Sequence, residues 1–282
     1  MEDAYDIQHD PHPAREVPPA RRIPHFGHTL VFFSLTAFCI LFTSGITLGI
    51  LHAHSAETAS QYPLPLAAAQ GVAYLLTLLC SMPLFPVFWG VPFFTGIQWN
   101  LRQAVRQWWK LVLIGIGLSL LAQFADRFVK QPDHVDMLEL FKSPLTSWCV
   151  AIFGSLLPAF MEEIAFRGFL LPSLATAYDW LSMERTPAGL DRWERTSDHS
   201  LPAWIFATVF SSAAFAALHG GQLHGALGPI VVLFAVSVTF SVIRIRTRSV
   251  AAAALVHAVY DALLFAEMAV ATGGFHHLDK LG

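Results

Sequence analysis

The chain has 282 residues, of which 55% are hydrophobic and only 13% are charged, and it contains 23 Phe and 8 Trp. A soluble globule of this length has too little interior to bury so many apolar side chains, so the composition excludes an ordinary soluble domain and indicates a protein of the lipid bilayer. The formal net charge of −3 carries no basic excess, and nucleic acid is therefore not an expected partner.

The predicted elements are transmembrane helices, each needing roughly 20 apolar residues to cross about 30 Å of hydrocarbon. In chain order we expect spans at residues 30–51, 66–94, 111–128, 145–177, 202–220, 227–243 and 249–272. The second segment contains Pro83, Pro86 and Pro92, so it is either one kinked span or a span followed by a re-entrant piece. The expected fold class is an all-α polytopic transmembrane bundle of about seven to eight spans.

Three parts are expected along the chain. Residues 1–29 are polar and Pro-rich, and they lack the compact apolar region of a secretory signal, so we expect a disordered cytoplasmic tail. Residues 30–272 form a single transmembrane domain, and residues 273–282 form a C-terminal tail. Two polar stretches interrupt the spans: residues 98–110 resemble either an interfacial amphipathic helix or an aromatic belt, and residues 179–201 resemble a solvated connector.

The positions of the basic residues predict the orientation in the membrane, because short cytoplasmic loops carry an excess of Lys and Arg. With the N-terminus inside, thirteen of the 17 basic residues fall in inner segments. The outer segments hold only Arg127, Lys130, Lys142 and Lys280. We therefore expect an integral membrane protein with a cytoplasmic N-terminus.

Two adjacent carboxylates, Glu162 and Glu163, end a long apolar run. A charged side chain in hydrocarbon costs at least ~2.5–3.5 kcal/mol, so such a pair is a candidate functional site. On a helix, Glu163 and Arg167 are neighbours at i,i+4 and are expected to form a bracing ion pair. Glu162 points about 100° away and is free to face a cavity as a general base. The alternative is that both glutamates are solvated at the inner interface.

Two later apolar segments carry histidines. His219 follows Phe215 by one helical turn at the end of the fifth span, and His257 precedes Asp261 by one turn in the seventh. The alternatives are that His219 is an interfacial residue and that the His257–Asp261 pair is a structural hydrogen bond. Because leaving such groups in lipid is costly, we expect Glu162, His219 and His257 to converge in one water-accessible cavity.

The depths of the two histidines raise a difficulty. If the fifth helix begins at the inner surface near Pro202, then His219 lies ~25 Å along it, whereas His257 lies only ~12 Å from Ser249. The depths agree only if the fifth helix begins well outside the bilayer.

In order, the motifs Glu-Glu-x-x-x-Arg, Phe-x-x-x-His and His-x-x-x-Asp resemble those of the CPBP family of intramembrane proteases, which includes type II CAAX prenyl proteases and bacteriocin-processing or immunity-type membrane proteins. The motifs lie within residues 145–265. The resemblance implies an intramembrane endopeptidase in which Glu162 and His219 activate a water, while His257 and Asp261 stabilise the oxyanion. Prenyl-protease members have Asn where this chain has Asp261, and an ionised Asp cannot donate to an oxyanion.

Cofactor and substrate follow from the same resemblance. Two His and one Glu form a catalytic zinc ligand set in several soluble peptidases, so Zn bound by Glu162, His219 and His257 is one alternative. No His-Glu-x-x-His run is present, and members described as glutamate-dependent favour a site without metal or other cofactor. The expected substrate is a peptide or membrane protein, prenylated in the best-known branch. The rival functions are a catalytically silent binding or immunity protein and, third, a transporter.

Overall fold

The computed structural model describes residues 22–53, 55, 58, 61–130, 140–141 and 143–277. In this part of the chain, seven helices are long and apolar enough to cross a membrane, which confirms the predicted all-α polytopic bundle. They are α1 (Phe26–Ile50), α3 (Pro63–Trp89), α6 (Trp108–Asp126), a composite helix (Pro144–Ser182), α10 (Leu201–Leu218), α11 (Leu227–Thr247) and α12 (Val250–Ala271).

The ends of the chain are only partly described. Residues 1–21 of the predicted N-terminal tail and residues 278–282 of the C-terminal tail lie outside the described residues. Helix α1 begins at Phe26, which is earlier than the predicted start at residue 30.

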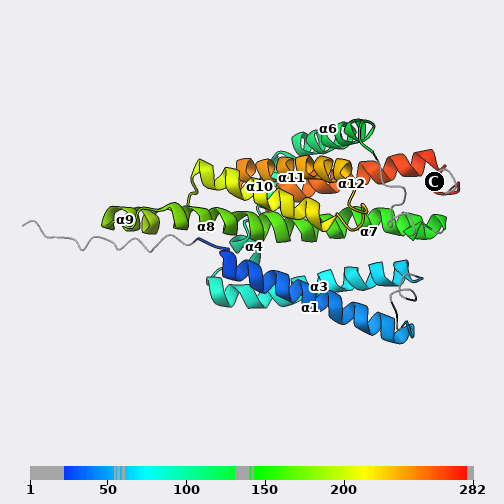
Figure 1. The fold of residues 1–282 in the computed structure, drawn as a ribbon, viewed down its shortest axis with the longest axis horizontal. Coiled ribbons are helices and arrows are strands. Elements are labelled where there is room, and N and C mark those ends of the chain that lie inside the picture. The colour runs from blue at the N-terminus through cyan, green and yellow to red at the C-terminus, as the bar shows by residue number, and fades with distance from the viewer. Residues whose placement is uncertain are drawn as a thin grey trace, which may run out of the picture.

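The composite helix lies in the middle of the bundle (Figure 1). On one side, α1 and α3 pack against each other as a hairpin and contact the composite helix. On its other side lie α6, α10, α11 and α12, with α12 packed between α6 and the first part of the composite helix. Groups on the composite helix can therefore meet residues from both halves of the bundle.

The composite helix is longer than the bilayer is thick. It consists of α7 (Pro144–Glu163), a π-helical segment η2 (Ile164–Leu170) and α8 (Leu171–Ser182). Its 39 residues extend about 58 Å at 1.5 Å per residue, against about 30 Å of hydrocarbon. In Figure 1, α8 runs past the end of the bundle at which α1 begins, called here the N-terminal end, and α9 (Pro187–Arg195) lies beyond it. The stretch 179–201 is thus partly helical.

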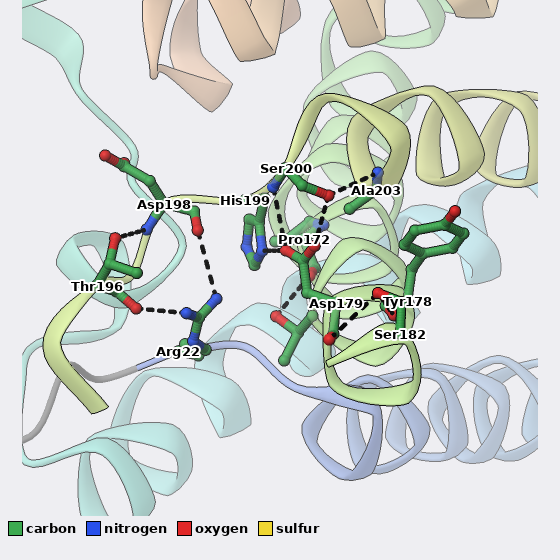
Figure 2. Close-up of polar contacts among 11 residues, drawn as sticks. Arg22, Pro172, Tyr178, Asp179, Ser182, Thr196, Asp198, His199, Ser200 and Ala203 are labelled. Carbon is green, nitrogen blue, oxygen red and sulfur yellow. Dashed lines mark hydrogen bonds and ion pairs between the residues drawn. The ribbon is translucent and has the colours of Figure 1, made fainter. Parts of the chain in front are cut away.

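The first turn of α10 is tied to this projecting helix through Asp179 of α8 (Figure 2). One carboxylate oxygen of Asp179 accepts from Ser200 Oγ at 2.6 Å, and the other lies 2.9 Å from His199 Nδ1. Ser200 Oγ in turn caps α10 by accepting from Ala203 N. Burial lowers the pKa of His199, and the contact with Asp179 opposes that shift. Since α10 begins beside the end of α8, it begins outside the main body of the bundle.

Arg22, four residues before the start of α1, reaches the same projecting region. The guanidinium of Arg22 donates to the Thr196 carbonyl and lies 3.7 Å from the centre of the Trp193 ring. Figure 2 shows Arg22 facing the linker between α9 and α10. This contact links the start of the first span to the extension formed by α8 and α9.

The second span ends before its third proline. Pro83 and Pro86 lie inside α3, whereas Gly90 caps the helix in the left-handed region with φ 63°, and Pro92 precedes the short helix α4 (Phe93–Gly96). Of the two predicted alternatives, the structure shows one span followed by a short helix. Residues 98–110 do not form the single helix of the first alternative, because α5 (Leu101–Arg106) stops and α6 begins as a separate helix at Trp108.

Helices α6 and α12 approach closely at Gly115. A Cβ atom at this position would lie 2.8 Å from the Val259 side chain and 2.9 Å from the Val256 carbonyl oxygen. Small residues at helix contacts allow such approaches in membrane proteins, where van der Waals packing drives association. A side chain on Gly117, by contrast, would meet no atom within 4 Å.

We predict that Gly115→Ala lowers the free energy of unfolding by about 1–3 kcal/mol, because the added methyl overpacks the contact. Thermal denaturation in detergent measures the effect. The matched control Gly117→Ala should leave the melting temperature unchanged or slightly raised, since Ala is a better helix former than Gly. Equal melting temperatures for the two variants would contradict the packing of α6 on α12.

Candidate active site

Glu163, the last residue of α7, is fully buried and joins two cationic or protonatable partners. Its Oε1 accepts from Arg167 Nη1 at 2.8 Å and lies 3.0 Å from His257 Nδ1. The ion pair that the i,i+4 spacing predicts is confirmed. The bond to His257 on α12 is additional, and it connects the composite helix to the seventh span.

Arg167 lies within η2 and is also fully buried. Its Nη2 donates to both the carbonyl oxygen and Oγ of Ser237 on α11, at 2.8 and 2.6 Å. The guanidinium carbon lies 5.0 Å from the centre of the Phe215 ring on α10 and 5.2 Å from that of Phe240 on α11. Arg167 therefore connects η2 with α10 and α11. The sequence analysis missed Ser237, because a serine in an apolar span does not by itself indicate a partner in another helix.

His257 is held at one ring nitrogen and faces two further carboxylates with the other. With Nδ1 donating to Glu163, the ring directs Nε2 to within 3.9 Å of Glu162 Oε2 and 3.5 Å of Asp261 Oδ2. The ring also stacks on Phe240, with centroids 4.5 Å apart. The structure thus brings Glu162, His257 and Asp261 together.

The two adjacent glutamates differ in how much of their side chains is exposed. The side chain of Glu163 has no exposed surface, whereas those of Glu162 and Asp261 are 23% and 21% exposed. Glu163 can therefore neutralise Arg167 and orient His257, whereas of the three carboxylates only Glu162 and Asp261 are open to a water or a substrate. This geometry agrees with the expectation that Glu162 faces an accessible space.

His219 lies close to the group formed by Glu162, His257 and Asp261, with the Phe215 ring in contact with both histidines. Its Nδ1 lies 2.9 Å from the Phe215 carbonyl oxygen, and the two rings pack with centroids 4.7 Å apart. The Phe215 ring also contacts His257, at 5.9 Å between centroids. Both histidines contact the Phe215 ring, so they lie at similar depth in the bundle. The depths agree because α10 begins outside the main body of the bundle. In the described part of the chain, no direct hydrogen bond joins His219 to Glu162 or His257.

A π-helical turn begins immediately after the two glutamates. Such i→i+5 turns are rare and occur frequently at functional sites. The wider turn of η2 covers residues 164–170 and therefore includes Arg167, which faces α10 and α11. No residue pattern in the sequence indicated this departure from α-helical geometry.

The structure also bears on the possible ligands of a metal. Among the residues that it describes, no group of three or more His, Cys, Asp or Glu side chains is arranged to hold a metal ion. Glu162, His219 and His257, the ligands of the zinc alternative, do not form such a group among the described residues.

Comparison with known proteins identifies the family. Residues 144–263 match the family model described as Type II CAAX prenyl endopeptidase Rce1-like. No curated protein and no solved structure matches the chain. The matched segment nearly coincides with the motif-bearing residues 145–265 and runs from the start of α7 into α12. This match confirms the resemblance to the CPBP family over residues 144–263, which form a CAAX-protease-like intramembrane endopeptidase domain.

We predict that Arg167→Ala destabilises the protein by ~3–5 kcal/mol, because removing one partner leaves the other charge buried and unpaired. The melting temperature and the yield of folded protein in detergent should fall together. Arg195→Ala is the matched control, since Arg195 forms an i,i+4 pair with Asp191 at 2.7 Å but is 76% exposed. An exposed pair contributes only ~0–1 kcal/mol. A fully stable Arg167→Ala protein that lacks activity would instead assign Arg167 to substrate binding.

Proposed function

We propose that the protein is a glutamate-dependent endopeptidase that hydrolyses a peptide bond near the C-terminus of a membrane-associated, prenylated substrate. The observation that carries this proposal is the placement of the partly exposed Glu162 beside His257, whose ring is oriented by the buried Glu163. The family of the domain supports the reaction class, and the prenylated substrate is proposed because that family is one of prenyl endopeptidases.

Glu162 is the general base of the proposed mechanism. It takes a proton from a water molecule, and the hydroxide that forms attacks the carbonyl carbon of the scissile bond. His219 donates from Nδ1 to the Phe215 carbonyl, which leaves its Nε2 as an acceptor that orients this water. The attack gives a tetrahedral intermediate with a negative oxygen.

His257 stabilises that oxygen. When doubly protonated, its ring donates from Nδ1 to Glu163 and presents Nε2–H to the oxyanion. Asp261 lies 3.5 Å from the same Nε2 and positions it. The proton held by Glu162 then passes to the amide nitrogen as the carbon–nitrogen bond breaks, so one water is consumed and two peptides leave.

Glu162→Gln should lower kcat by at least ~10²-fold, because the amide preserves the shape but cannot accept a proton. Cleavage of a prenylated CaaX peptide by purified protein in detergent or vesicles measures this loss. Glu194→Gln on the exposed face of α9 is the matched control and should keep the wild-type rate. Peptide binding without cleavage by the wild-type protein would favour the silent binding protein instead.

Asp261→Asn should keep most of the activity, because the amide can donate to the oxyanion that the family's Asn is expected to stabilise. In the same assay a chelator should leave the wild-type rate unchanged. Activity that is lost with the chelator and restored by Zn²⁺, in protein holding about one metal per chain, would contradict the metal-free mechanism and reassign Glu162, His219 and His257 as ligands. The endopeptidase proposal would survive that result.

A further inference from the structure

A second buried arginine, Arg244 near the end of α11, has no carboxylate partner. Its exposure is only 4%. Its Nη2 donates to the neutral side-chain oxygen of Gln98 at 2.9 Å, and its Nε has no hydrogen-bond partner. Among the described residues, no acid forms an ion pair with it, whereas Arg167 is neutralised by Glu163. A buried charge without a counter-charge is costly, so an anion that reached this guanidinium would stabilise it.

The contacts of Arg244 fix its position relative to the proposed active site. It follows Phe240 by one turn on the same helix face, and Phe240 stacks on His257. Its partner Gln98 accepts a backbone hydrogen bond from Val250, the first residue of α12, at 3.1 Å. The guanidinium therefore lies near the start of α12. Val250 precedes His257 by seven residues, or about 10.5 Å along the helix axis.

The surroundings favour an anion on the side of Gln98. Arg244 lies beside the N-terminus of α12, where the helix dipole is positive. Gln98 itself is exposed, and its backbone has the left-handed φ of 58°, which is uncommon for a residue other than Gly. The exposed Gln98, whose neutral amide makes one hydrogen bond to Arg244, thus lies between the buried guanidinium and the surface at the N-terminal end of the bundle.

We propose that Arg244 binds the C-terminal carboxylate of the substrate, three residues beyond the scissile bond. This inference rests on the proposed function. The axial rise of about 10.5 Å along α12 from Val250 to His257 is close to the 10–11 Å that a fully extended tripeptide spans at most. The carboxylate replaces the Gln98 amide on the guanidinium and forms a charge-assisted, bidentate pair. Arg244 would then make the enzyme select peptides that end three residues after the cleaved bond.

The test compares two prenylated peptides that differ only in ending as a free acid or as an amide. The protein is reconstituted in vesicles of phosphatidylcholine alone, so that no anionic lipid can occupy the guanidinium. Wild-type protein should cleave the acid with a kcat/KM at least ~10-fold higher than that of the amide, as expected for charge-assisted bonds. A peptide lengthened by one residue, which moves the carboxylate by about 3.3 Å, should also be cleaved more slowly.

Arg244→Gln should abolish the preference for the acid, chiefly by raising the KM for that peptide. Arg246→Gln, at an exposed position of the same helix end, is the matched control and should keep the preference. Equal cleavage of acid and amide by the wild-type protein would overturn the role of Arg244 and leave the endopeptidase intact. This comparison decides the inference even if Arg244→Gln does not fold. Cleavage of neither peptide would overturn the proposed function as well.

Discussion

The buried contact of Glu163 with Arg167 and His257 is the constraint around which the rest of the site is arranged. Two fully buried charged side chains are stable in a membrane domain only when they are paired and hydrogen-bonded. Glu163 neutralises Arg167 and binds His257, and Arg167 in turn bonds to Ser237. The network therefore joins the composite helix to α11 and α12, and it holds the π-helical turn in place.

This arrangement separates structural from reactive carboxylates. Glu163 is enclosed, so it can orient the His257 ring but cannot reach a substrate. Glu162, the preceding residue, points to an accessible side and meets the opposite ring nitrogen. The length of the composite helix contributes as well, because α8 carries the start of α10 outside the bundle and thereby brings His219 to the depth of His257. The positions of these few residues thus depend both on their spacing within one helix and on the packing between helices.

The sequence predicted much of the fold for identifiable reasons. Apolar segments of membrane-spanning length are a local property, and all seven expected spans correspond to helices in the described residues. The Glu163–Arg167 pair was predictable because both partners lie on one helix at i,i+4. The breaks in helices were less predictable, since neither the stop at Arg106 nor the continuation of α8 to Ser182 is marked by a proline at that point.

By itself, the sequence determined the membrane fold class, the ordered Glu, His and Asp motifs and the local ion pair, because each depends on composition or on spacing within one helix. Only the tertiary structure decided that Glu163 binds His257, that Arg167 binds Ser237, and that no acid of the described residues pairs with Arg244. These contacts join residues that are far apart in the chain, such as Arg167 and Ser237 across 70 positions. They depend on how helices pack and on where η2 departs from α-helical geometry, which no local pattern encodes.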